Sequence, residues 1–411
     1  MATSIFTQLQ LPNGSVIPSR LAKAAMEENL ADANQAPGDA LFRLYERWAR
    51  GSAGLIITGN VMVDGTAMTG PGDVVLEDDR HLPAFKRWAT CARAGGAHVW
   101  MQISHPGRQV YAALGQTAVA PSAVPVDIPG FSKMFAPVRE LSDHEIRAVV
   151  ARFVSTAQWA EQAGFTGVEV HAAHGYLLSQ FLSPLTNRRT DGWGGSLQNR
   201  ARLLVDIVRG IRAQVSPSFC VAVKLNSADF QRGGFDLADA CEVVNMLNEC
   251  NVDLIELSGG NYEAPAMQGQ ARDGRTLARE AWFLEFAREV RGIARMPLMV
   301  TGGIHRRETA ERVLAEGIAM VGMATALALR PELPLEWRSG RPIVAELPSV
   351  TWKSKVFAAL ATQAMVKRQL RRLSVAGPIK AVGRPFLSLV CDQWQTHLRS
   401  RQYRRWIRSR V

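Results

Sequence analysis

The sequence predicts an α/β fold, namely a (β/α)8 or TIM barrel over residues 1–340 followed by a helical, basic extension over residues 341–411. Short apolar runs alternate with longer amphipathic segments, which is the pattern of a parallel sheet covered by helices. Eight such runs occur, the number that a closed barrel of this type requires. The alternation ends near Pro334, where basic residues begin to accumulate. An open, doubly wound sheet is the alternative, but no GxGxxG motif follows the first strand.

The predicted elements follow one another regularly along the chain. Strands are expected at Leu21–Ala25, Leu55–Thr58, His98–Ile103, Gly167–Val170, Cys220–Leu225, Leu254–Leu257, Leu298–Val300 and Met320–Gly322. Helices are expected between them, among others at Asp39–Arg50, Asp143–Gln162, Leu197–Gln214, Ala281–Gly292 and Arg307–Ala315. Ser142 and Asp143 are candidate caps of the second of these helices, with Glu145 close behind.

Two segments depart from this order. Residues Ala118–Arg139 are rich in Pro and Ala and are too long for an ordinary connection, so a hairpin or a lid over the barrel mouth is expected. Beyond Pro334, the segments Trp352–Leu373 and Pro385–Arg408 look helical, with Gly377-Pro378 and Gly383 between them.

The composition indicates a globular protein with a large core, since 47% of the residues are apolar and 21% are charged. No run of about 18 apolar residues is present, and the N-terminus lacks the pattern of a secretory signal. The five cysteines are scattered and never in CxxC spacing, which predicts reduced thiols, no iron–sulfur cluster and a cytoplasmic location.

The positive charge lies at the C-terminal end. The chain carries a net charge of +11, yet residues 351–411 alone hold 14 Lys or Arg against the single acidic residue Asp392. The remainder of the chain is therefore slightly acidic, and the basicity gives no information about the substrate of the barrel.

The stretch Glu169–Arg200 carries the clearest chemical signal. It follows a buried strand and places His171, His174 and Tyr176 within six residues, at the strand end where barrels of this type build their active sites. Two neutral imidazoles can donate hydrogen bonds to one carbonyl oxygen, and a tyrosine can deliver a proton. Such a set suits hydride addition to an electron-poor C=C bond. A His-x-x-His metal pair is an alternative, but it has no HExxH motif or third ligand nearby, and histidines that only stabilise a barrel rim are another.

The run HAAHGYLLSQFLSPLTNRRTDGWGGSLQNRARLL resembles the Old Yellow Enzyme family of FMN-dependent NAD(P)H oxidoreductases, and the similarity extends from about Leu11 to about Pro334. The resemblance implies FMN at the C-terminal mouth, reduction by NADH or NADPH, and ping-pong hydride transfer to activated alkenes such as enones and nitroalkenes. It implies that His171 and His174 bind the activating group and that Tyr176 donates the proton. Larger relatives carry an iron–sulfur cluster and a further reductase domain, for which this chain has neither the cysteines nor the length, so the single-domain form is expected.

Two polar residues at strand ends match the cofactor contacts that the resemblance implies. The carboxamide of Gln102 suits the flavin pyrimidine edge, and Lys224 would stabilise negative charge near N1, where the family usually has arginine. The small residues Ala24 and Ala25, just before Met26, allow the backbone to approach a flat ring closely. The full set of expected FMN contacts is Ala24, Ala25, Met26, Gly59, Asn60, Gln102, His171, Lys224, Gly302, Gly303, Ala324 and Thr325.

The phosphate of FMN is expected after the seventh and eighth strands, where the amides of Gly302 and Gly303 can cradle it. Relatives commonly have Gly-Arg where this chain has Ala324 and Thr325, so either FMN binds more weakly or Arg306 or Arg307 compensates. A second departure is Glu27, which stands where relatives have Thr, Ser or Cys near the flavin C4=O, and which affects the tuning of the flavin potential. The expected substrate contacts are His171, His174, Tyr176, Asn226 and Tyr262, with Ser227 and Met267 as further candidates for the pocket rim.

Two other functions are compatible with parts of the sequence. A barrel isomerase or aldolase with a phosphorylated substrate would explain Thr301-Gly302-Gly303 but not Gln102 and Lys224. A flavin-binding scaffold could act through its tail, where six arginines alternate with aromatic residues: Arg399, Arg401, Arg404, Arg405, Arg408 and Arg410. The tail is expected either to form a solvated terminal helix packed on the barrel or to make weak contact with an anionic surface, and no specific nucleic acid is expected.

Overall fold

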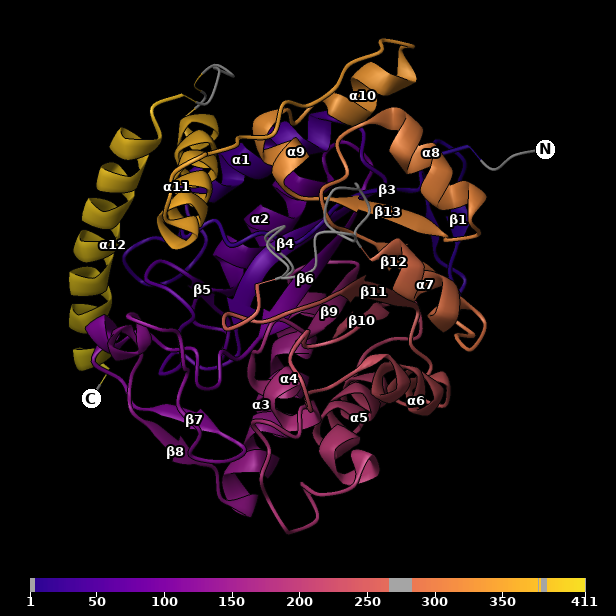
Figure 1. Cartoon of the computed structure of the whole chain (residues 1–411). Coiled ribbons are helices and arrows are strands. Elements are labelled where there is room, and N and C mark those ends of the chain that lie inside the picture. Colours follow the sequence, from indigo (N-terminus) through magenta and orange to yellow (C-terminus); the bar gives the residue numbers. More distant parts are fainter. Residues whose placement is uncertain (1–3, 266–282, 376, 378–382, 411) are drawn as a thin grey trace.

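The computed structural model describes residues 4–265, 283–375, 377 and 383–410. Within these residues, eight parallel strands form a closed barrel, because β3 pairs with both β4 and β13 (Figure 1). In chain order these strands are β3 (Leu21–Lys23), β4 (Leu55–Met62), β6 (His98–Ser104), β9 (Gly167–Ala172), β10 (Cys220–Asn226), β11 (Leu254–Ser258), β12 (Leu298–Val300) and β13 (Met320–Met323). All eight predicted strands, and with them the predicted barrel, are confirmed.

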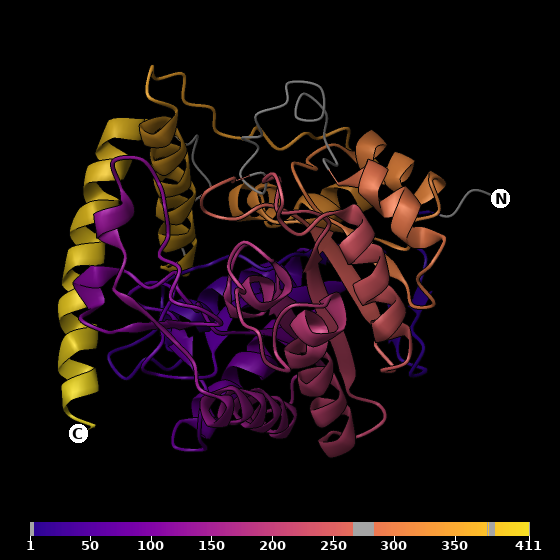
Figure 2. The same cartoon turned by 60° about the horizontal axis from the view of Figure 1, so that its bottom comes forward.

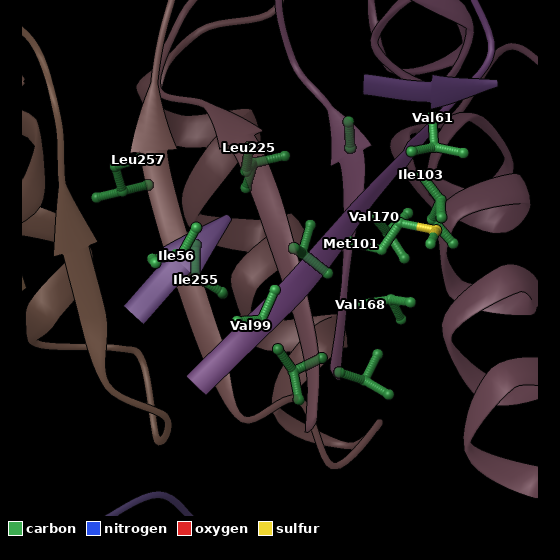
Figure 3. Close-up of a cluster of buried hydrophobic side chains, with 14 of the residues drawn as sticks. Ile56, Val61, Val99, Met101, Ile103, Val168, Val170, Leu225, Ile255 and Leu257 are labelled. Atoms are coloured by element: carbon green, nitrogen blue, oxygen red, sulfur yellow. The ribbon is translucent and has the colours of Figure 1, made fainter. Parts of the chain in front are cut away.

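Side chains alternate along each strand between the barrel interior and the surrounding helices. The residues that face the helices are apolar and form the main core, to which Ile56, Val99, Val168 and Ile255 belong (Figure 3). A second apolar cluster, which includes Leu55, Trp100, Ala222 and Leu254 from the alternate positions, fills the N-terminal half of the interior. The antiparallel pair β1 (Leu9–Gln10) and β2 (Val16–Ile17) adds to this cluster and closes that end. The polar residues of the strands are therefore left for the C-terminal half.

Helices surround the barrel as the amphipathic segments predict. They are α1 (Asp39–Arg50), α2 (Leu82–Arg93), α3 (Asp143–Gln162), α5 (Leu197–Gln214), α6 (Leu237–Asn248), α7 (Leu284–Arg291) and α8 (Arg307–Ala315), and short helices α4 (Leu177–Leu182), α9 (Thr325–Leu329) and α10 (Leu333–Arg338) follow strand ends. Ser142 and Glu145 form a complete capping box at the start of α3. The helix predicted at Ala281–Gly292 corresponds to α7, and its predicted first residue, Ala281, lies outside the described residues.

The segment between β6 and α3 forms an excursion beside the barrel mouth. Its strands β7 (Ala118–Ala120) and β8 (Val138–Glu140) pair in parallel, so the predicted hairpin is wrong: a two-stranded hairpin is antiparallel, and here the intervening chain crosses back before pairing. The rings of Phe135 and Tyr262 lie 6.2 Å apart, and Arg108 donates to the Pro125 carbonyl at 2.7 Å. These contacts place the excursion at the mouth.

The basic extension forms two helices, α11 (Lys355–Ser374) and α12 (Pro385–Arg408), which lie side by side along one flank of the barrel (Figures 1 and 2); Pro378, between them, lies outside the described residues. Helix α11 packs against α1 and α9. Helix α12 is fixed by Tyr403, which is fully buried and donates to the Gly65 carbonyl at 2.9 Å, and by ion pairing of Arg410 with Glu77. The arginine-rich end is thus a helix packed on the barrel. Among the described residues, no helix is both long and apolar enough to span a bilayer.

Candidate active site

The C-terminal half of the barrel interior is lined by polar side chains from neighbouring strands. Gln102 on β6 lies opposite Glu169 on β9, and its amide donates to Glu169 Oε2 at 2.6 Å. Lys224 on β10 lies between His171 and Glu256, and its Nζ donates to Glu256 Oε1 at 2.7 Å. All five side chains are buried. Because inward positions recur every second residue, these side chains all face the barrel interior, with Glu169 two residues before His171 on β9.

The predicted histidine pair is brought together by β9 and the turn that follows it. The rings of His171 and His174 lie 5.0 Å apart. His171 Nδ1 accepts a hydrogen bond from the Ala173 amide at 3.2 Å, so the proton of the neutral ring is on Nε2. Burial, followed by the charges of His174 and Lys224, lowers the pKa of His171 well below its ordinary value. The imidazole is therefore neutral and remains a hydrogen-bond donor.

His174 is held in a defined position by its backbone conformation and by two contacts. Its backbone has a positive φ of 62°, its amide donates to Asn226 Oδ1 at 3.1 Å, and its Nε2 lies 2.7 Å from Ser258 Oγ. Burial, then the charge of Lys224, lowers the pKa of His174 well below the ordinary value. Asn226 thus supports the turn that carries His174, and Ser258 was not predicted from the sequence.

Tyr176 completes the predicted catalytic group. Its ring lies 4.8 Å from the His171 ring, and its hydroxyl lies 3.1 Å from that of Tyr262. Burial, followed by the negative charge of Glu27, raises the pKa of Tyr176 well above the ordinary value. The phenol therefore keeps its proton at neutral pH, as a proton donor must until it transfers it.

Beneath these residues lies a buried carboxyl pair. Burial, then the charge of Glu256, raises the pKa of Glu169 well above its ordinary value, while Lys224 opposes this effect. Among the described residues, Glu169 Oε1 and Glu256 Oε2 have no other hydrogen-bond partner, so a proton shared between them satisfies both. Gln102 and Lys224 are thereby oriented from below.

Some of the residues expected to contact FMN form a partly exposed rim above this layer. Ala25 and Met26 follow β3, Gly302 and Gly303 follow β12, and Ala324 follows β13, and all are partly exposed. Gly302 and Gly303 have φ values of 113° and 69°, a backbone form that glycine adopts readily and that can turn successive amides toward an anion. Helix α9 begins at Thr325, so its free first amides lie at the same end. Polar strand ends below and an amide cradle at the side fit a flavin mononucleotide.

Some predicted contacts are already engaged within the protein. The Gly59 amide donates to the Tyr45 hydroxyl at 3.1 Å, and the Asn60 amide group donates to Thr69 at 3.1 Å. Arg307 bonds Glu311 and the Trp337 carbonyl, so it is committed away from the phosphate position. Ser227 is buried against the Ser258 carbonyl, and Met267 lies outside the described residues. No group of three or more potential metal ligands occurs in the part of the chain that the structure describes.

A cluster of charged residues that the sequence does not group lies at the rim beyond Met26. Lys367 on α11 approaches Glu27 to 3.6 Å, and the buried Asp73 accepts hydrogen bonds from Asn29 and from the Gly70 amide at 2.9 and 2.7 Å. The C-terminal extension therefore reaches the mouth of the barrel.

The geometry agrees with the comparison with known families. Residues 4–343 match the family described as NADH:flavin oxidoreductase / NADH oxidase. The chain belongs to this family. FMN and NAD(P)H are accordingly its cofactors.

Relatives of the family share more than a third of their aligned residues with this chain. A NADH-dependent flavin oxidoreductase of Neonectria sp. (strain DH2) is 39% identical over 351 residues, which are 79% of this chain and 46% of that protein. A protein with the same description from Hypocrea jecorina (strain QM6a) is 37% identical over 345 residues, 78% of this chain and 85% of the relative. The chain thus spans less than half the length of the first relative and most of the second.

Solved structures of the family resemble the fold over most of the chain. A 2-naphthoyl-CoA reductase with bound 2-naphthoyl-CoA superposes with a TM-score of 0.78 at 27% identity, covering 90% of this chain and 58% of that one. Morphinone reductase gives a TM-score of 0.69 at 26% identity, covering 85% and 92%. An old yellow enzyme homologue from Zymomonas mobilis, at 24% identity and a TM-score of 0.72 over 84% and 94%, shares the fold.

Proposed function

We propose that this protein is an ene-reductase that uses NAD(P)H and FMN to reduce activated C=C bonds. The observation that carries the proposal is the grouping of three rings at the barrel mouth, with His171 4.8 Å from Tyr176 and 5.0 Å from His174. Two neutral donors beside a protonated phenol suit an alkene that becomes negatively charged at a carbonyl or nitro oxygen and then takes up a proton. When bound, FMN supplies the hydride carrier between NAD(P)H and the alkene.

Each side chain has a distinct part in this proposal. His171 Nε2 and His174 bind the activating oxygen and stabilise the charge that develops on it. Tyr176 delivers its proton to the α-carbon, and Tyr262, 3.1 Å from it, orients the hydroxyl. Gln102 and Lys224 hold the pyrimidine edge of FMN, and the amides of Gly302, Gly303 and Thr325 hold its phosphate.

The substrate is proposed to be an unsaturated carbonyl or nitro compound. Morphinone reductase and 2-naphthoyl-CoA reductase, two structural relatives, carry carbonyl-containing substrates in their names, which supports this class. A barrel isomerase or aldolase is disfavoured by membership of the flavin family. The five cysteines are unpaired, and we propose the cytoplasm as the location because its thiols stay reduced.

The proposal is tested by the colour and reactivity of the purified protein. We expect a yellow protein that releases FMN on denaturation, is bleached by NADH or NADPH without oxygen, and turns over a panel of enones, maleimides and nitroalkenes. A colourless protein that FMN cannot reconstitute would contradict the proposal. A yellow protein inert toward both nicotinamides would instead favour a flavin-binding scaffold.

We further propose that helix α12 contacts anionic lipid surfaces weakly. Along its solvent face, exposed apolar residues in the first turns, including Phe386 at 71% and Trp394 at 62% exposure, give way to exposed arginines at Arg401, Arg404, Arg405 and Arg408. Apolar residues with an aromatic ring beside cations are the composition of a helix that lies on an anionic bilayer.

Sedimentation with vesicles tests this surface. The protein should co-sediment with phosphatidylserine vesicles at low salt, dissociate as salt rises, and bind neutral phosphatidylcholine vesicles poorly. Trp394→Ala should weaken binding without changing flavin content. No co-sedimentation at low salt would exclude the lipid contact, and loss of a dimer in Trp394→Ala would show that the face binds a second copy instead.

A further inference from the structure

Lys367 is a residue of the C-terminal extension that lies at the barrel mouth. It lies on α11, retains only 24% exposure, and its Nζ is 3.6 Å from Glu27 Oε2. Burial alone would lower the pKa of Lys367, but the carboxylates of Glu27 and Asp392 outweigh it and the net shift is upward. Lys367 therefore stays charged at the barrel mouth.

The cation lies near two acidic residues, Glu27 and Asp73. Asp73 is buried, and burial together with the charge of Glu27 raises its pKa well above the ordinary value, despite the bond from the Gly70 amide and the opposing charge of Lys367. The raised pKa of Asp73 reduces the negative charge that this carboxyl contributes, and the carboxylate that Lys367 approaches is that of Glu27. The positive charge of Lys367 offsets the charge of that carboxylate.

The charge of Glu27 acts directly on the proposed catalytic group. Glu27 follows Met26, a proposed FMN contact. Burial is the largest cause of the raised pKa values of Tyr176 and Tyr111, and the charge of Glu27 is the second largest. Without a partner, a carboxylate at this rim would repel the negative charge that both FMN reduction and alkene reduction create there.

The position of Lys367 is fixed by the packing of the extension. Arg43 of α1 donates to the Ser374 carbonyl at 2.7 Å at the end of α11, and Arg371 pairs with Asp392 of α12. Arg399 of α12 in turn donates to the Ala31 carbonyl at 3.0 Å, four residues from Glu27. The two helices and the β3 loop thus form one connected unit.

We propose that the C-terminal extension is part of the active site, where Lys367 is a positioning residue that neutralises Glu27 and so favours a negatively charged flavin and substrate oxygen. This inference rests on the proposed placement of FMN at the mouth. It also explains how the chain accommodates a glutamate at position 27: the compensating charge comes from a segment beyond the matched residues 4–343.

The test compares Lys367→Met with Lys353→Met, which removes an exposed lysine just before α11. The readout is the midpoint potential of bound FMN, measured at one pH for all variants. Lys367→Met should shift the equilibrium about tenfold toward oxidised flavin, roughly 30 mV for a two-electron couple, and Lys353→Met should not. The double variant Glu27→Gln with Lys367→Met should return to the wild-type potential.

Two results would overturn the inference. One is a midpoint potential of bound FMN in Lys367→Met equal to that in Lys353→Met. The other is a midpoint potential that stays below the wild-type value when Glu27→Gln is combined with Lys367→Met. Thermal unfolding of each variant checks that the fold is retained. FMN content separates the two proposals, since a protein that never binds FMN contradicts the proposed function as well, whereas a flavin-loaded Lys367→Met variant with unchanged potential contradicts the role of Lys367 alone.

Discussion

At the scale of single residues, the two imidazoles act as preorganised hydrogen-bond donors. His171→Ala or His174→Ala should weaken the binding of enones and phenols while FMN stays bound, and should cost about 3 kcal/mol of transition-state stabilisation, as the loss of one such donor does in comparable sites. Binding titrations and kcat/KM measure the effect, with His144→Ala on the exposed surface of α3 as the control. Phenol affinity that is unchanged in both variants would exclude this role.

Tyr176 should act in only one half of the catalytic cycle. Tyr176→Phe removes the proton but keeps the ring, so anaerobic flavin reduction by NAD(P)H should stay close to wild type while reoxidation by an enone slows. A nitroalkene should be affected less, because its product can leave unprotonated. Stopped-flow measurement of each half-reaction distinguishes this from a structural role, in which both rates would fall together.

Lys224 and Glu256 form a buried ion pair at 2.7 Å. Removing one partner should lower the free energy of unfolding more than replacing both partners with uncharged residues. Lys224→Met should reduce the free energy of unfolding by roughly 3 kcal/mol, because Glu256 is left as an uncompensated buried charge. Adding Glu256→Gln should recover most of that loss, and chemical denaturation of the four proteins of this cycle measures the coupling. Equal losses in the single and double variants would mean that Glu256 finds another partner.

The residues that sequence analysis could identify are those that lie close together along the chain. His171, His174 and Tyr176 follow one strand within six residues, and Gln102 and Lys224 end strands that are otherwise apolar. Ser258, Asp73 and Lys367 come from distant segments, and nothing in their own neighbourhoods marks them. Glu169 and Glu256 could have been identified as site residues from the sequence, since each is a charged residue inside an otherwise apolar strand.

At the scale of elements, the extension shows where sequence patterns lose information. Its two helices were predicted from composition, but its many arginines conceal which face packs on the barrel. The contact is decided by Tyr403, whose ring is fully buried, and not by the apolar residues Phe386 and Trp394, which face solvent. The structure therefore confirms the expected packing of a terminal helix on the barrel and assigns it to the buried ring of Tyr403.

Two aromatic residues of α12 allow this to be measured. Tyr403→Ala should lower the free energy of unfolding by about 3 kcal/mol, as truncation of a buried aromatic ring does, whereas Trp394→Ala, at 62% exposure, should change it by less than about 0.5 kcal/mol. Removal of residues 399–411 should destabilise at least as much as Tyr403→Ala. Equal stability of the two single variants would show that α12 is not anchored through Tyr403.

At the scale of the whole molecule, the barrel was predictable because its signal is repeated eight times. Each strand is short, apolar and followed by an amphipathic helix, so errors at individual boundaries do not change the topology. The excursion at 118–140 was not predictable in the same way, because its parallel pairing joins segments some twenty residues apart through chain of no regular pattern. The expectation that it lies at the mouth, in contrast, followed from its length and its place after a strand end, and the segment lies beside the mouth.

Hydride transfer from NAD(P)H to an activated alkene at this barrel mouth is tested most directly by an anaerobic single turnover. The protein is first bleached with one equivalent of NADH or NADPH and is then mixed with an activated alkene such as a maleimide, while the flavin absorbance is followed. We expect the oxidised spectrum to return in full, with one equivalent of saturated product formed, and the return to be slowed in Tyr176→Phe. A bleached protein that only oxygen can reoxidise, with no saturated product from any enone or nitroalkene, would contradict the assignment.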